Sequence, residues 1–266
     1  MGELVFVGLG LSSVQDMSVR ALEVLRGCDL VFAEFYTSKL IDSNVDELSR
    51  LIGKEVRVLE RVDVEEGEEV IEAARSRKVA FVTAGDTMAA TTHVDMRLRA
   101  MEEGISTSLV HGVSIFTACA SALGLQPYKF GRTITLPFPE KNFLPASPYE
   151  NILENKKRGL HSLVLLDIRE AEDRFMSASE GVQWLLDAEK RLRGGLMQAD
   201  SLVCAAARVG SPTEKLVAGY AAEVVKMDLG PPLHTLVVPG KLHFMEAEAL
   251  VKMAGAPPEI IKERKG

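Results

Sequence analysis

A glycine-rich turn near the start of the chain has the residue types that bind nucleotide-like ligands. The apolar run at residues 4–7 is followed by Gly8 and Gly10 and then by a helical pattern. This order predicts a strand, a tight turn and a helix. Glycine lets the backbone approach a ligand closely, and in an open α/β sheet such a turn lies at the carboxyl ends of the strands. Ser13 stands where the dinucleotide fingerprint has its third glycine, which weakens a nicotinamide or flavin interpretation.

Two later loops have the same position between a predicted strand and a predicted helix. Residues 84–87 contain Asp86, and residues 112–115 contain Ser114. Because the carboxyl ends of parallel strands meet at one edge of a sheet, we expect both loops to lie beside the glycine turn. Asp86 is then either the N-cap of the next helix or a carboxylate that binds an amino group or ribose hydroxyls. Ser114 has the same two interpretations, and by itself the cap is favoured.

Glu34 and the histidines are less specific signals. Glu34 follows the second predicted strand, where dinucleotide-binding and common methyltransferase sheets have an acid for ribose hydroxyls. His234 follows a rigid Gly-Pro-Pro entry to a strand, and it is either a ligand contact or a structural histidine bonded to the backbone. The five histidines and three cysteines lack paired metal-ligand spacing, and neither GxSxG nor Walker A occurs. We therefore expect no metal, and chemistry that depends on positioning rather than on a dedicated nucleophile.

Alternating strands and helices must position these loops. In the first half, strands are predicted at residues 4–7, 30–33, 56–59, 79–83 and 108–111, with helices that include one ending at Gly27 and two at 65–77 and 91–102. This alternation predicts a largely parallel sheet. After a proline-rich segment, the second half has predicted strands at 133–136, 162–168, 202–207 and 235–238 and helices at 179–193, 212–225 and 242–253. The prediction is two α/β domains, residues 1–124 and 125–266, with a ligand cleft between them.

Composition restricts the class of protein. The chain has 266 residues, of which 47% are apolar, and a net charge of 31 − 38 = −7, which argues against a nucleic-acid backbone as the main partner. The three widely spaced cysteines are expected to be buried, reduced thiols. No signal peptide or membrane-spanning run is apparent in the sequence. We expect a cytoplasmic enzyme without a membrane or direct nucleic-acid partner.

The whole ordered set of segments resembles one family. The resemblance is carried by residues 6–11, 31–38, 85–93, 128–131, 159–163, 166–168, 231–234, 238–243 and 246–248. Together they resemble the archaeal diphthine synthase family, in the tetrapyrrole-methylase-like class of S-adenosylmethionine-dependent methyltransferases. The usual Pro-Gly-Asp-Pro of the family is Ala-Gly-Asp-Thr at residues 84–87, and Val209 stands where a smaller alanine is common.

The resemblance implies a homodimer of two-domain subunits that holds S-adenosylmethionine and releases S-adenosylhomocysteine. It implies cofactor contacts at Leu11, Asp86, Ala89, Ser114, Ile115, Leu166, Val209 and His234. The implied substrate is a histidine of translation elongation factor 2 that already bears a 3-amino-3-carboxypropyl group, whose amino group is methylated to form diphthine.

Three other functions fit parts of the sequence. A methyltransferase of a small corrin-like metabolite would use the same fold. An NAD-dependent oxidoreductase is supported by Gly8, Gly10 and Glu34 only. A non-catalytic binding module would not need two complete α/β domains.

Overall fold

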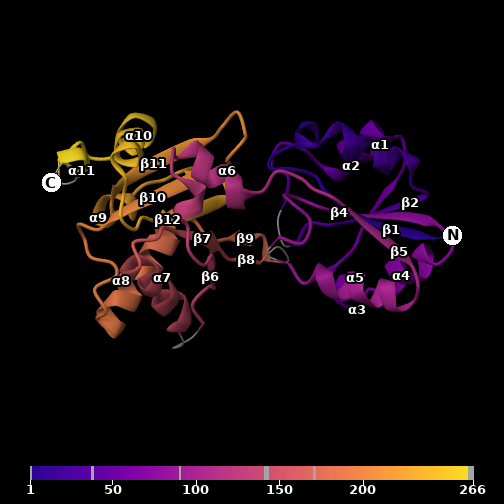
Figure 1. Ribbon diagram of the computed structural model, residues 1–266, viewed down its shortest axis with the longest axis horizontal. Helices are drawn as coiled ribbons and strands as arrows, with labels where there is room; N and C mark the ends of the chain where they lie inside the picture. The colour runs from indigo at the N-terminus through magenta and orange to yellow at the C-terminus, as the bar shows by residue number, and fades with distance from the viewer. Residues whose placement is uncertain (1, 37–38, 90, 141–143, 170–171, 263–266) are drawn as a thin grey trace. The chain divides into compact units, whose positions relative to one another are not determined.

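In the computed structural model, the described residues are 2–36, 39–89, 91–140, 144–169 and 172–262, and the chain forms two compact units (Figure 1). Unit 1 is built from the first 115 residues and unit 2 from most of the remainder. Unit 1 gives way to unit 2 between Ile115 and Phe116, which is earlier than the predicted domain boundary after residue 124. The difference arises because α6 (Ile115–Ala122) belongs to unit 2 apart from its first residue. The segment after α6 is also tied to unit 2, since the Gln126 amide donates to the Glu246 carboxylate at 2.9 Å.

Unit 1 contains the predicted parallel sheet, with the strand order β3-β2-β4-β1-β5 among the described residues. The strands are β1 (Glu3–Gly8), β2 (Leu30–Glu34), β3 (Val56–Val58), β4 (Lys78–Thr83) and β5 (Ser106–Val110). The helices are η1 (Val14–Asp16), α1 (Val19–Gly27), α2 (Val45–Ile52), α3 (Arg61–Glu66), α4 (Glu68–Ala74) and α5 (His93–Glu102). All five strands therefore end at one edge, which is where a doubly wound sheet binds its ligand.

Side chains alternate along the buried strands and build one core on each face of this sheet. On β1, Val5 and Val7 pack with the apolar residues of α1 and α2. Leu4 and Phe6 pack with those of α3, α4 and α5. Figure 1 shows the two groups of helices on opposite sides of the strands. This period of two is what the strand geometry requires of a sheet covered on both faces.

The helix predicted at residues 65–77 is two helices, α3 and α4. Gly67 lies between them with φ 64°, a left-handed conformation that ends α3 while its amide bonds to the Asp63 carbonyl. A glycine adopts this conformation without the steric cost that a side chain would impose. The sequence pattern also did not predict α2, which begins at the Asn44 cap and ends at Gly53.

Unit 2 contains a mixed sheet with the strand order β11-β10-β12-β7-β6 in the described part of the chain. Its strands are β6 (Ile134–Leu136), β7 (Ser162–Leu166), β10 (Leu202–Ala207), β11 (Lys215–Tyr220) and β12 (His234–Val238). Only β6 and β7 pair in parallel; the other neighbours are antiparallel. The short strands β8 (Ile168–Arg169) and β9 (Arg174–Phe175) pair with each other. The helices and turns are η2 (Pro127–Lys129), α7 (Ser147–Lys157), α8 (Ala178–Leu192), α9 (Ala221–Val224), α10 (Phe244–Ala254) and α11 (Glu259–Lys262).

The helix predicted at residues 212–225 is wrong. Residues Lys215–Tyr220 form strand β11, which pairs antiparallel with β10, and only Ala221–Val224 is helical. Pro212 lies in the connecting turn, which the Glu214 amide closes on the Ser211 carbonyl at 3.0 Å. Proline after serine fits a helix start and a turn equally well. The pairing of residues 215–220 with strand β10 decided in favour of the turn.

The three cysteines are free and buried, as expected. Burial raises the pKa of the Cys119 thiol to about 12, so this thiol is protonated at neutral pH and unreactive. Among the described helices, none combines the length and the apolar character needed to cross a membrane.

Candidate functional site

Three loops meet at the carboxyl edge of the unit 1 sheet. The turn after β1 and the loop after β4 are joined by two backbone hydrogen bonds between Gly10 and Gly85, at 3.1 and 2.6 Å. A Cβ on Gly8 would lie 2.6 Å from the Gly85 carbonyl oxygen and 2.7 Å from the Gly112 nitrogen. The three loops are therefore packed backbone against backbone, which only glycine permits at these positions. The predicted convergence of the three loops is confirmed.

The first loop turns differently from a dinucleotide-binding turn. Asp16 folds back, and its carboxylate accepts hydrogen bonds from the Ser12 and Ser13 amides at 2.7 and 3.0 Å. Ser13 is the N-cap of the short turn η1, and helix α1 begins later, at Val19. A Cβ on Gly10, which has φ 90°, would also meet the Asp16 side chain at 2.5 Å. The residue in place of the third fingerprint glycine thus caps a 3₁₀ turn instead of packing a helix against the strand.

Asp86 ties the second loop to the third. Its carboxylate accepts a hydrogen bond from the Gly112 amide at 3.0 Å and contacts His111 Nδ1 at 3.0 Å. The N-cap interpretation is wrong, because the next helix, α5, has Thr92 as its N-cap. The Asp86 side chain keeps 20% of its surface exposed, and a carboxylate has more acceptor positions than these contacts use. It can therefore both hold the loops together and bind a ligand.

The other residues expected at this edge lie in the same three loops. Leu11 follows the first turn, Ala89 bonds back to the Asp86 carbonyl at 3.3 Å, and Ser114 and Ile115 lie where the third loop enters α6. All four are partly exposed. The edge thus offers two larger apolar side chains, a hydroxyl and a carboxylate, which are the groups that a ligand with an apolar ring and polar substituents requires.

Leu166, Val209 and His234 lie together at one edge of the unit 2 sheet. Leu166 ends β7 and His234 begins β12, and these two strands are antiparallel neighbours. His234 is also the register partner of Ala207, the last residue of β10, with Val209 two residues further along the chain. Residues 25 to 68 positions apart in sequence are brought to one place by antiparallel pairing, which the sequence alone did not reveal.

His234 is held by backbone groups on both ring nitrogens. Its Nδ1 accepts a hydrogen bond from the Ala178 amide at the start of α8 at 3.1 Å, and Nε2 donates to the Pro231 carbonyl at 3.0 Å. Burial lowers the pKa of His234, so the neutral ring with the proton on Nε2 fits both bonds. Beside the ring lies a cavity of about 300 Å³, also lined by Ser177, Ser179 and Lys226. The interpretation of His234 as a structural histidine bonded to the backbone is confirmed. The ring also lies at the wall of a cavity.

Arg208 is a residue that the sequence pattern did not single out. It is buried, with φ 51°, and its guanidinium donates to the carbonyl oxygens of Thr213, Leu229 and Pro231. These bonds fix the β10–β11 turn and the loop that precedes His234. The guanidinium offers five donors in a rigid fork, so one side chain can hold both loops.

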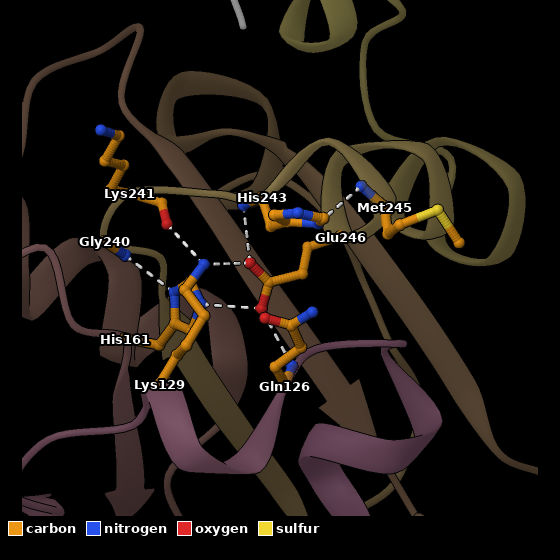
Figure 2. A network of polar contacts seen from close by, with 8 residues as sticks. All are labelled: Gln126, Lys129, His161, Gly240, Lys241, His243, Met245 and Glu246. Carbon is orange, nitrogen blue, oxygen red and sulfur yellow. Dashed lines mark hydrogen bonds and ion pairs between the residues drawn. The ribbon is translucent and has the colours of Figure 1, made fainter.

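A buried carboxylate organises the other edge of the unit 2 sheet (Figure 2). Glu246, in the first turn of α10, accepts hydrogen bonds from the Gln126 amide at 2.9 Å, the His243 amide at 2.7 Å, His161 Nε2 at 3.0 Å and the Lys129 ammonium. The Gly240 amide donates to His161 Nδ1 at 3.0 Å, so the histidine proton lies on Nε2 and points at the carboxylate.

Apart from Gln126, these residues belong to the segments that carry the family resemblance, yet they lie away from Leu166 and His234. His161 precedes β7 and Gly240 follows β12, so both are at the opposite strand ends from Leu166 and His234. The hydrogen bonds to Lys129 and to backbone amides lower the pKa of Glu246 although burial opposes them. The arrangement is a structural link between η2, the two strands and α10.

The loop contacts give a prediction for Gly8→Ala. The added Cβ would overlap two backbone segments that cannot rotate away, and we expect a loss of about 1–3 kcal/mol in the free energy of unfolding. Gly27→Ala is the matched control, because a Cβ there meets nothing within 4 Å and alanine favours the helix. Urea denaturation measures both, and equal stability of the two variants would contradict the close packing of the loops.

The chain is similar in sequence to one family of known proteins. A model of the tetrapyrrole (corrin/porphyrin) methylases matches residues 3–225. The chain is 44% identical over 265 residues to a diphthine synthase of Methanosarcina acetivorans, covering 98% of this chain and 99% of that protein. It is 46% identical to a diphthine synthase of Methanocella arvoryzae, covering 95% and 98%.

A solved structure gives the same result at the level of the fold. A crystal structure of diphthine synthase superposes with a TM-score of 0.89 at 37% identity, covering 97% of this chain and 98% of that chain. The similarity covers 97% of this chain and therefore runs through both units. The chain belongs to the diphthine synthase family of the tetrapyrrole (corrin/porphyrin) methylases.

Proposed function

We propose that this chain is an S-adenosylmethionine-dependent methyltransferase of diphthamide biosynthesis. Its substrate is the 3-amino-3-carboxypropyl-histidine of translation elongation factor 2, and its product is diphthine. The observation that carries the proposal is the similarity, over almost the whole length of both chains, to proteins named diphthine synthase. A homodimer and a cytoplasmic location are part of the proposal, and the family resemblance supports them.

The residues at the unit 1 edge fit this cofactor. Gly85 leaves open space in front of its loop, since nothing lies within 4 Å of a Cβ built there. Asp86 has acceptor capacity for an amino group or ribose hydroxyls, and Leu11 and Ile115 are partly exposed apolar groups for a ring. We propose cofactor contacts at Leu11, Asp86, Ala89, Ser114 and Ile115. In unit 2, the contacts proposed from the family resemblance are Leu166, Val209 and His234.

When bound, the cofactor would supply a methyl group on a positively charged sulfur, and an uncharged amine would take this methyl group in line, forming the C–N bond as the C–S bond breaks and the neutral thioether leaves. The residues of this chain supply orientation. Loops fixed by Gly8, Gly10 and the bond from Gly112 to Asp86 cannot drift relative to one another. A rigid site of this kind lowers the barrier by holding the reacting groups in position before reaction. The displacement disperses the positive charge of the sulfonium, so no oxyanion hole is needed.

The test is mass spectrometry of elongation factor 2 that carries the precursor side chain. After incubation with this enzyme and S-adenosylmethionine, we expect methyl groups on the modified histidine residue and none on unmodified elongation factor. Methylation of a corrin-like metabolite without methylation of the elongation factor would favour the related small-molecule activity. Retention of NAD instead of labelled S-adenosylmethionine would favour the oxidoreductase.

The hydrogen bond from the Gly112 amide to the Asp86 carboxylate also predicts the effect of Asp86→Ala on cofactor affinity. We expect the dissociation constant to rise at least tenfold, because the variant loses a ligand acceptor and releases the Gly112 amide. Calorimetry with a chelator present measures the affinity and tests whether binding needs a metal. Asp95→Ala is the control, since that carboxylate lies on α5 in a surface ion pair with Arg99. Unchanged affinity in Asp86→Ala would remove Asp86 from the site.

A further inference from the structure

A buried polar cluster lies at the base of the Asp86 loop. It consists of Glu34, Thr83 and His93, and Thr87 lies four residues after Thr83 in the loop itself; each is no more than 2% exposed. Glu34 and Thr83 are register partners at the ends of the parallel strands β2 and β4, so their side chains point to the same face. This is the face covered by α3, α4 and α5, because Phe81, two residues before Thr83, belongs to that core.

His93, the first residue of α5, belongs to this cluster through its contacts with Glu34 and Phe81. Its ring contacts Phe81 edge-on, with centroids 4.9 Å apart. Its Nε2 is 3.7 Å from Glu34 Oε1, which is longer than a direct hydrogen bond. Glu34 is thus unsuited to the ribose role that its position after β2 suggested, since its carboxylate is enclosed beside a histidine.

Several polar atoms of the cluster and of Thr87 find no protein partner within the described ranges. They are both ring nitrogens of His93 and the hydroxyl oxygens of Thr83 and Thr87. Leaving such groups unpaired in an apolar core is costly. A site with two to four converging polar partners is the kind that holds an internal water, and a polar separation beyond 3.5 Å is commonly bridged in this way.

We propose that these side chains form an internal water site that fastens the loop of residues 86–89 to the sheet, with His93 as a positioning residue for cofactor binding. Thr87 is the point of attachment, because it lies in the loop between Asp86 and Met88. Met88 has φ 68°, a conformation that a side chain adopts only where its surroundings enforce it. The cofactor part of this inference rests on the proposed function; the water site does not.

The sign of a stability change tests the water site. Thr87→Val keeps the shape of the side chain and removes the hydroxyl. If the hydroxyl binds water, the melting temperature falls; if it is unpaired, the substitution is neutral or stabilising. Thr135→Val, at an exposed position of β6, is the matched control and should melt as the parent protein does. An unchanged or raised melting temperature in Thr87→Val overturns the water site.

Loop mobility and affinity test the positioning role. In His93→Phe, which retains an aromatic ring beside Phe81, hydrogen exchange of the amides at residues 86–89 should become faster without ligand present. The dissociation constant for S-adenosylmethionine should rise about tenfold, the equivalent of one lost hydrogen bond. Unchanged exchange overturns the positioning role. Failure of the parent protein to bind S-adenosylmethionine overturns the proposed function instead, and the exchange result still decides the role of His93.

Discussion

Glu246→Ala is expected to destabilise unit 2 by about 3–5 kcal/mol, the range found when one partner of a buried ion pair is removed. The Glu246 carboxylate is fully buried and accepts bonds from two side chains and two backbone amides. Alanine leaves the His161 ring with no acceptor for its Nε2 proton, and it leaves the buried end of the Lys129 ammonium with the Lys241 carbonyl but no carboxylate. Chemical denaturation followed by the fluorescence of Trp184, which lies in the unit 2 core, measures the loss.

The matched control lies two residues further along the same helix. Glu248 pairs with Lys252 at 2.6 Å, and its side chain is 44% exposed. Such surface pairs contribute at most about 1 kcal/mol, so Glu248→Ala should unfold at nearly the same denaturant concentration as the parent chain. A similar small loss in both variants would show that the Glu246 link contributes no more than a surface pair.

Acid is expected to destabilise unit 1 through His93. Burial lowers the pKa of this histidine from 6.5 to about 4. Between these two pH values the unfolded chain binds more protons than the folded chain, so stability falls as the pH falls. The contribution is fully present above pH 6.5 and is lost on acidification to about pH 4. At about 1.4 kcal/mol for each pKa unit, the loss is about 3 kcal/mol.

Unfolding free energies measured between pH 7 and pH 4 test this expectation. The unfolding free energy of His93→Phe should depend on pH less than that of the parent chain, by this amount. Unit 2 will also lose stability in acid, since burial lowers the pKa of His161 and hydrogen bonds lower that of Glu246. Equal slopes for His93→Phe and the parent chain would mean that the pKa of His93 is the same in the folded and the unfolded chain.

The local pattern was sufficient for the strands of unit 1, although it missed α2 and merged α3 with α4. The central strands β1, β2 and β4 are short apolar runs between helical segments, and a parallel sheet buried on both faces requires such runs. The convergence of the three loops follows from the same pattern, because every parallel strand ends at the same edge. Gly8, Gly10 and Asp86 could therefore be placed together from the sequence.

Only the tertiary structure decided the rest. Residues 215–220 could be helix or strand by their spacing, and pairing with β10 made them a strand. His161 and Glu246 are 85 positions apart, and His93 and Glu34 meet only because α5 begins over the end of β2. Buried polar groups choose their partners by distance in the fold, and a single sequence contains no local pattern for such pairs. The sequence by itself determined which loops could bind a ligand, whereas the packing of distant segments determined what holds those loops in place.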